Sequence, residues 1–177
     1  MRPLLTALAA LALLATGASA QQVADPQADL SVAHPAFTAA HAPHVVIDAA
    51  HNNFHTVEGR YAPFAQLLRN NGMIVDGSDA PLSNASLAHV DILVIANPLA
   101  AVNAPNNWRL PTPSAFTPDE IAAVHGFVER GGSLFLIVDH MPFAGCTHDL
   151  AAAFGVEFEN GFALRALPGQ PTTPDMF

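Results

Sequence analysis

Three side chains that could do metal or acid–base chemistry follow one short apolar run. Asp48, His51 and His55 come directly after the β-branched and aliphatic residues 45–47. Two imidazoles four residues apart can bind one divalent metal when they lie on a helical turn, and a carboxylate can complete such a site. An aspartate beside a histidine is also the pairing that hydrolases use to move protons.

Polar side chains also follow two later apolar runs. Asn97 follows residues 91–96, and Asp139 and His140 follow residues 134–138. The carboxyl ends of parallel strands meet at one edge of a sheet, and ligands bind there near the topological switch point. The sequence therefore predicts one binding site at this edge. Its predicted members are Asp48, His51, Asn52, His55, Asn97, Asp139 and His140.

Three interpretations of these residues stay open. A divalent metal site would use His51, His55 and His140 as candidate ligands. A polar pocket without a metal would bind a small molecule between apolar walls formed by Phe54 and Phe143. In a purely structural interpretation, the carboxylates cap helices or tie loops, and the histidines form hydrogen bonds with the backbone.

Cys146 is the only cysteine, so the chain can form no internal disulfide. It precedes a predicted helix start, where the helix dipole would lower the pKa of its thiol. A catalytic thiol also needs a base and a group that orients the base. His140 and His148 do not complete such a set in the sequence. We predict that Cys146 is at least partly buried and unreactive.

The elements that must position these residues can be read from apolar runs and helix signals. Buried strands are predicted at residues 44–48, 73–76, 91–96 and 133–139, and the start of a fifth at 156–158. Helices are predicted before Asn71-Gly72, after a capping box formed by Thr117 and Glu120, and over Thr147–Phe154. This alternation predicts an α/β fold. We expect three layers around a mainly parallel, flavodoxin-like sheet of strand order 2-1-3-4-5.

A long loop interrupts this pattern at residues 99–116, which are rich in proline and asparagine. Long loops inside small domains often carry function. Trp108 and Arg109 could fold over a ligand as a lid, or simply pack the loop down.

The ends of the chain differ from its centre. Residues 1–20 combine a charged start, a short apolar run and Ala18-Ser19-Ala20, which predicts a cleavable signal peptide and a secreted or periplasmic protein. The run is too short to span a bilayer, and no later segment is long enough. Residues 21–43 predict a flexible tether, and residues 44–165 the α/β domain. Residues 166–177 form an irregular tail, so we expect a fold truncated at its C-terminus.

The charge balance excludes some partners. The chain has 15 acidic residues, six arginines and no lysine, and its net charge is −9. An acidic chain without a basic cluster is not expected to bind nucleic acid or anionic membranes. The oligomeric state stays open.

Two motifs of this chain resemble a bacterial secreted family of unknown function within the class I glutamine amidotransferase-like superfamily. The first runs from Asp48 through His51 and His55 to Gly59-Arg60-Tyr61, and the second is the strand from Gly131 that ends Asp139-His140-Met141-Pro142-Phe143. The resemblance implies a flavodoxin-like fold and no established activity. The superfamily's Gly-x-Cys-x-Gly elbow and downstream His-x-Glu are both missing here, so glutaminase activity is not expected.

Two classes of function follow from the sequence. The favoured one is a secreted ligand-binding or scaffold domain whose ligand is a carbohydrate or another small molecule of the cell envelope. The alternative is a hydrolase that uses the histidine–aspartate cluster, with or without a divalent metal. No other cofactor is expected.

Overall fold

A sheet of four parallel strands forms the centre of the fold, in the order β2-β1-β3-β4. The structure, a computed structural model, describes residues 23–105, 107–165, 168–169 and 173–174. The strands are β1 (His44–Asp48), β2 (Ile74–Ser78), β3 (Ile92–Ala96) and β4 (Ser133–Ile137). The first four predicted strands and their parallel arrangement are therefore confirmed.

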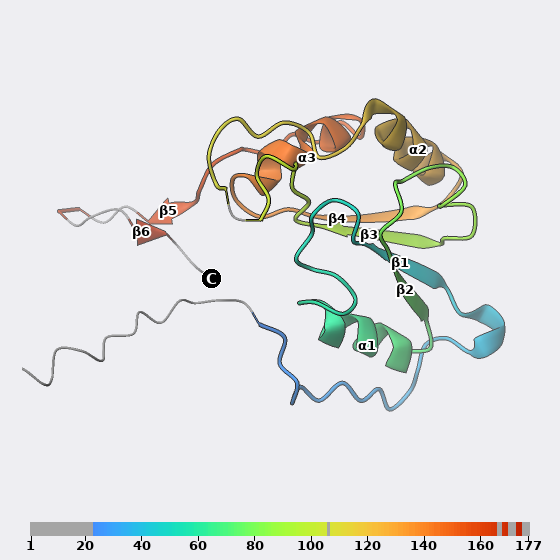
Figure 1. The fold of residues 1–177 in the computed structure, drawn as a ribbon. Coiled ribbons are helices and arrows are strands. Elements are labelled where there is room, and N and C mark those ends of the chain that lie inside the picture. The colour runs from blue at the N-terminus through green and yellow to red at the C-terminus, as the bar shows by residue number, and fades with distance from the viewer. Residues whose placement is uncertain (1–22, 106, 166–167, 170–172, 175–177) are drawn as a thin grey trace, which may run out of the picture.

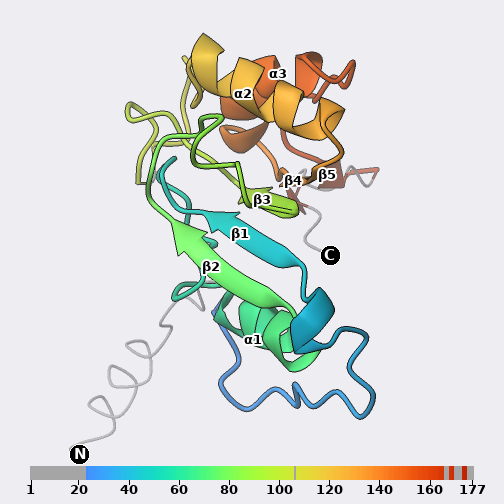
Figure 2. The same ribbon diagram turned by 90° about the vertical axis from the view of Figure 1, so that its right-hand side faces the viewer.

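Helices cover both faces of this sheet. α1 (Ala62–Asn70) lies on one side, whereas α2 (Pro118–Glu129) and α3 (Phe143–Ala152) lie on the other (Figure 1). The second view shows the same separation (Figure 2). The predicted three-layer α/β fold is confirmed.

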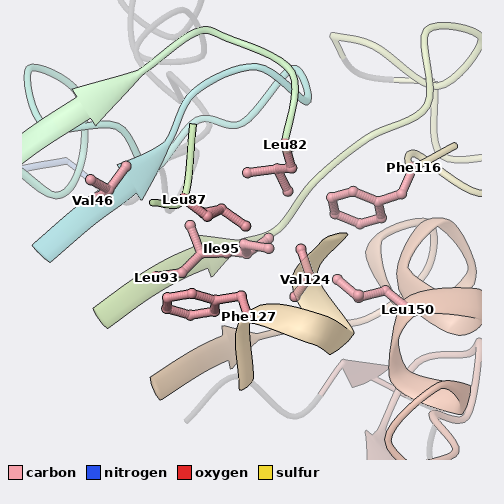
Figure 3. Packing of buried hydrophobic residues seen from close by; sticks show 9 residues of the cluster. All are labelled: Val46, Leu82, Leu87, Leu93, Ile95, Phe116, Val124, Phe127 and Leu150. Atoms are coloured by element: carbon pink, nitrogen blue, oxygen red, sulfur yellow. The ribbon is translucent and has the colours of Figure 1, made fainter. Parts of the chain in front are cut away.

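The core is divided between the two faces because side chains alternate along each strand. On the α2 side, Val46, Leu93 and Ile95 pack with Val124 and Phe127, as Figure 3 shows. On the α1 side, a second cluster is formed by Val45, Ile47, Val57, Ala65, Val75 and Val94. β1 and β3 are buried on both faces, as expected for central strands of a parallel sheet.

α2 begins as the sequence predicts. The Thr117 hydroxyl accepts the Glu120 N–H, and the Glu120 carboxylate accepts the Thr117 N–H at 2.9 Å, which completes the capping box. Pro118 occupies the first turn, where its missing N–H costs nothing. This cap fixes the carboxylate of Glu120 at the end of the helix that faces β1.

Two predicted elements are wrong. α3 begins at Phe143 and not at Thr147, because the buried face at Phe143, Cys146 and Leu150 already has helical spacing. The Thr147 hydroxyl does not cap the helix but donates to the Phe143 carbonyl at 2.8 Å. Residues 156–158 form no strand, because the Val156 N–H is used to close α3 on the Ala151 carbonyl.

The segment after α3 instead leads to a separate two-stranded antiparallel sheet, β5 (Leu164–Arg165) with β6 (Thr173–Pro174). The predicted signal peptide, residues 1–20, lies outside the described residues, as does most of the predicted tail, 166–177. Among the described helices, none has the length and apolar character needed to cross a membrane.

Part of the predicted tether is held against α1. The Asn70 side chain donates to the Leu30 carbonyl at 2.7 Å, and the Asn71 side chain accepts the Ala36 N–H at 2.8 Å. A short 3₁₀ turn, Ala39–His41, then leads into β1. Residues 30–43 therefore run past the C-terminal end of α1 toward β1. Val23 lies near the opposite edge of the sheet, where the strands have their carboxyl ends.

Candidate functional site

A buried histidine lies between two carboxylates where β1 ends. His51 Nδ1 lies 3.0 and 2.9 Å from the two carboxylate oxygens of Asp48. On the other side of the ring, His51 Nε2 lies 3.2 Å from Glu120 Oε1. The relative exposures of these side chains are 6% for His51, 0% for Asp48 and 11% for Glu120. We call this group the His51 cluster.

The charged forms of the residues in the His51 cluster stabilise one another. Burial disfavours a charged imidazole, but the hydrogen bond and charge of Asp48, together with Glu120, outweigh it and raise the pKa of His51. Burial also acts to raise the pKa of Glu120, but hydrogen bonds from Thr117, the nearby His51 and the Leu82 N–H lower it overall. The arrangement therefore favours an imidazolium between two carboxylates.

The His51 cluster has no open position for a substrate. Both ring nitrogens have protein partners, and the ring packs on Phe116 with centroids 4.4 Å apart. Its contacts join the end of β1, the Leu82 loop and the start of α2. The capping-box motif predicts where Glu120 lies, but nothing in the sequence predicts its contact with His51.

A second group of polar side chains lines an open hollow on the α1 side of the same sheet edge. His55, Arg60 and Tyr61 come from the loop after β1 and its junction with α1, while Asn97 follows β3 and Asp139 follows β4. The hollow has a volume of about 380 Å³, and its remaining lining residues are Val23, Ile137 and Val138. We call it the His55 hollow.

The β1–α1 loop that supplies three of these side chains is tightly wound. The N–H groups of Gly59 and Tyr61 both donate to the Thr56 carbonyl, at 3.0 and 3.3 Å. A Cβ on Gly59 would lie 2.7 Å from the Thr56 hydroxyl and 2.8 Å from the Phe54 carbonyl, so only glycine fits this turn. The guanidinium of Arg60 lies over the Phe54 ring, 5.1 Å from its centroid.

Asn97 joins the ends of β3 and β4. Its backbone is left-handed, with φ of 48°, a conformation that asparagine tolerates better than most residues. Its side-chain oxygen accepts the Asp139 N–H at 2.9 Å, and its own N–H donates to the Ile137 carbonyl at 3.0 Å. These two hydrogen bonds hold Asp139 at the rim of the His55 hollow.

His55 differs from His51 in its electrostatic surroundings. Burial and the positive charge of Arg60 lower the pKa of His55, against an opposing effect of Asp139. Its Nδ1 is buried and has no hydrogen-bond partner among the described residues. Its ring packs edge-on against Tyr61, with centroids 4.8 Å apart, and burial raises the pKa of the Tyr61 phenol. At neutral pH the hollow therefore has a neutral imidazole beside a protonated phenol.

Asn52 was predicted to bind ligand, and the structure places it outside the hollow. It is exposed and left-handed, with φ of 51°, and its side chain donates to the Leu99 carbonyl at 2.9 Å. Asn53 acts in the same way on the Ala96 carbonyl at 3.1 Å. Asn53 thus fastens the β1–α1 loop to the end of β3, and Asn52 fastens it to the segment that follows β3.

His140 lies in an aromatic cluster. Its ring stacks on Phe162 and packs against Trp108, with both centroids 4.6 Å away, and Phe143 is 5.7 Å away. Its Nδ1 faces the Met141 carbonyl at 2.6 Å. Trp108, considered above as a lid, packs the long loop onto α3 and does not line the His55 hollow.

The three candidate metal ligands, His51, His55 and His140, therefore have separate surroundings. In the part of the chain that the structure describes, no three histidine, cysteine, aspartate or glutamate side chains are arranged to hold a metal ion. The structure does not bring these three imidazoles together, because the loop after β1 is not a helical turn.

Cys146 is fully buried, as predicted. Its sulfur accepts the Ala100 N–H at 3.4 Å and lies 3.6 Å from the Asn103 side-chain oxygen. Burial raises the pKa of the Cys146 thiol, against the effect of the Ala100 N–H. Asn103, which the sequence analysis missed, donates to the carbonyls of Asn107, Arg109 and Pro111 and so organises the long loop.

A second hollow, of about 490 Å³, lies at the opposite edge of the sheet. It is lined by Asn84, Leu87, Ala88, Val90, Phe127, Arg130 and Gly132. Arg130 is its one ionisable lining residue, and the Arg130 guanidinium donates to the Asn84 side chain at 3.2 Å. The His55 hollow is the better candidate site, because it lies at the carboxyl ends of parallel strands and holds both acidic and basic groups.

No protein-family model, curated protein or solved structure matches this chain. The resemblance to an amidotransferase-like family therefore stays a prediction from two motifs. What this protein does has to be inferred from the geometry of its own residues.

Proposed function

We propose that this chain is a secreted ligand-binding domain, and that the His55 hollow binds a neutral, hydroxyl-rich molecule such as a carbohydrate of the cell envelope. One observation carries the proposal. Side chains from the β1–α1 loop and from the ends of β3 and β4 converge on one open hollow at the carboxyl edge of a parallel sheet. The signal-peptide pattern of residues 1–20 supports export.

The chemistry of the lining favours a neutral ligand. Arg60 supplies a cation and Asp139 an anion, while His55 and Tyr61 are uncharged at neutral pH. A phosphate or carboxylate ligand would lie against Asp139, and a cationic ligand against Arg60. Hydroxyl groups can both donate to the carboxylate and accept from the guanidinium, so a polyol suits both ends of the hollow.

The volume of the hollow suits one small molecule. At about 380 Å³, the His55 hollow falls within the range of ligand pockets and would hold one or two sugar rings. Tyr61 offers an aromatic wall, and Ile137 and Val138 give apolar contact. Fixed polar groups on an apolar wall are the usual composition of such sites.

Titration calorimetry of the untagged protein against mono- and disaccharides and soluble peptidoglycan fragments tests the proposal. We expect at least one of them to bind, and Asp139→Asn to weaken that binding about tenfold or more, since it removes a charged acceptor. Asp149→Asn is the matched control, because Asp149 is an exposed carboxylate on α3, away from the hollow. Absence of binding to every neutral sugar, or equal effects of the two variants, would contradict the proposal.

One observation favours a hydrolase as the second candidate. A neutral His55 beside Asp139 could accept a proton from a water molecule, which is general-base chemistry. Cys146 would take no part, because its thiol is buried behind Ala100 and Asn103. Hydrolysis of a chromogenic ester or glycoside that is lost in His55→Gln and kept in Cys146→Ala would favour this candidate over simple binding.

A further inference from the structure

His55 presents only one of its two ring nitrogens to the His55 hollow. Its Nδ1 is buried and has no hydrogen-bond partner among the described residues, whereas its Nε2 is not enclosed in this way. A buried N–H without an acceptor is rarer in proteins than a buried lone pair without a donor. The single proton of the neutral imidazole therefore belongs on Nε2, where it can be donated to a ligand.

Asn97 supplies a second N–H donor, and its orientation is fixed. The side-chain oxygen accepts the Asp139 N–H at 2.9 Å, so the amide group cannot be flipped without losing this hydrogen bond. The amide nitrogen has no partner among the described residues and is not among their enclosed unpartnered atoms. Because Asn97 lines the hollow, this nitrogen is available to a ligand there.

Donors outnumber acceptors in the lining of the hollow. Arg60 adds a guanidinium, which can only donate, to the N–H groups of His55 and Asn97. Asp139 is the one described lining side chain that can only accept, and its Oδ1 already accepts the His140 N–H at 2.9 Å. A ligand that matches this lining therefore needs more acceptor atoms than donor hydrogens.

An amide group fits this lining better than a hydroxyl group does. A hydroxyl oxygen that accepts from these donors still carries a hydrogen, and among the lining side chains only the Asp139 carboxylate and the Tyr61 phenol can accept it. An amide carbonyl can accept twice and has no hydrogen of its own. The amide N–H can donate to Asp139, and a methyl group on the carbonyl carbon can lie against the apolar Ile137 and Val138.

We propose that the His55 hollow recognises an acetamido group, and that its ligand is therefore an N-acetylated amino sugar. This inference rests on the carbohydrate-binding function proposed above and narrows its ligand class. The acetamido carbonyl accepts from the His55 Nε2–H and the Asn97 amide, while the acetamido N–H donates to Asp139. The hydroxyl groups of the sugar are left for Arg60 and Tyr61.

The same tautomer bears on the hydrolase considered as the second candidate. With its proton on Nε2, the imidazole of His55 has no lone pair on the side of the hollow and cannot take a proton from a water molecule there. His55 is in this arrangement a specificity-determining residue for binding and not a general base.

Titration calorimetry of the untagged protein with N,N′-diacetylchitobiose and with cellobiose tests the proposal. The two disaccharides differ only in having an acetamido or a hydroxyl group beside the anomeric carbon of each ring. We expect N,N′-diacetylchitobiose to bind about tenfold tighter or better, which corresponds to about one hydrogen bond. Equal binding, or tighter binding of cellobiose, would overturn the acetamido proposal and leave the carbohydrate-binding function standing. If neither binds, the acetamido proposal fails, and the function proposed above fails with it only if every other sugar also fails to bind.

The variant His55→Phe isolates the contribution of the Nε2–H. Phenylalanine keeps a ring for the contact with Tyr61, and removal of the unpartnered Nδ1 costs no hydrogen bond. We expect the affinity for N,N′-diacetylchitobiose to fall about tenfold, and the affinity for cellobiose to change less. His125→Phe is the matched control, because His125 lies on α2, on the other face of the sheet (Figure 1). Equal effects of the two variants would refute the role of His55.

Nitrogen NMR of the isotope-labelled wild-type protein measures the tautomer directly, and it keeps the test valid if His55→Phe does not fold. At neutral pH we expect the His55 ring to show a protonated Nε2 and an unprotonated Nδ1. A proton on Nδ1 instead would overturn the acetamido proposal even if a sugar binds, because the hollow would then lack this donor.

Discussion

Removal of the His51 side chain should destabilise the fold strongly. The substitution His51→Ala leaves the carboxylates of Asp48 and Glu120 without their shared partner, in positions where their side chains are 0% and 11% exposed. Breaking a buried ion pair by removing one member typically costs about 3–5 kcal/mol, because a buried charge stays uncompensated. The ring contact with Phe116 is lost as well.

The control for this prediction is an exposed histidine–carboxylate pair in the same protein. His125 and Glu129 lie 3.6 Å apart on α2, with side chains 42% and 69% exposed. Exposed pairs contribute about 0.2–1 kcal/mol. We therefore expect His125→Ala to change the free energy of unfolding by less than about 1 kcal/mol, measured by urea denaturation followed by circular dichroism.

The pH dependence of stability provides a second measurement of the same cluster. The pKa of His51 is raised in the folded state, so its contribution is fully present below the unfolded pKa of about 6.5 and is lost as pH rises through the folded pKa. The pKa of His55 is lowered, so the unfolded state binds the proton more readily and stability rises with pH toward about 6.5. The two histidines have opposite effects.

Single variants should separate these two effects. We expect the free energy of unfolding of His55→Gln to rise less steeply with pH below about 6.5 than that of the wild type, and to keep the fall above that pH. His51→Gln should lose that fall and keep a rise with pH at lower values. The ion-pair account of the His51 cluster fails if His51→Ala costs no more than His125→Ala, or if His51→Gln keeps the wild-type slope above pH 6.5.

Three further predictions concern the rest of the sheet edge. Asn97→Ala should lower the free energy of unfolding, measured by urea denaturation, by about 2–4 kcal/mol, because it forces a left-handed backbone on alanine and removes the hydrogen bond to the Asp139 N–H. Asn97→Gly should cost clearly less, and equal costs would count against backbone strain. Cys146 should react with iodoacetamide only after denaturation, and rapid labelling of native protein at pH 6 would contradict its burial. A chelator should leave the melting temperature unchanged, because His51, His55 and His140 have separate partners, and a clear decrease would point to a metal site formed in another way.

The parallel sheet could be predicted from sequence because its signals are local. Continuous apolar runs at residues 45–47 and 92–96 are typical of strands buried on both faces, and the capping box at Thr117 sets the start of α2 within one residue. α3 was harder to place because its first turn combines a preceding proline with two small residues, Ala144 and Gly145, and no side-chain cap. Burial of Phe143 against Leu99 and Ala100 fixes its start, and this contact is not local.

The candidate site could be predicted only in part, because three of the predicted residues, His55, Asn97 and Asp139, line the His55 hollow and the others lie elsewhere. All parallel strands end at one edge, which brings Asp48, Asn97 and Asp139 near one another whatever the loops do. The loop residues have no such constraint. Arg60 and Tyr61 were part of a motif noted in the sequence, but only the wound loop around Gly59 shows that they line the same hollow as His55.

The division of the predicted cluster follows from the path of the chain between two histidines. A spacing of four residues places two side chains on one face only if the segment is helical. After β1 the backbone instead turns through a left-handed Asn52, which Leu99 holds in place. His51 is thereby directed to the α2 side, where Glu120 and Phe116 lie, and His55 to the α1 side, where Tyr61 lies. One histidine is held in a closed ion-paired group that supports the fold, and the other lines an open hollow. Histidine and aspartate side chains thus have a structural role on one face of the sheet and a proposed binding role on the other.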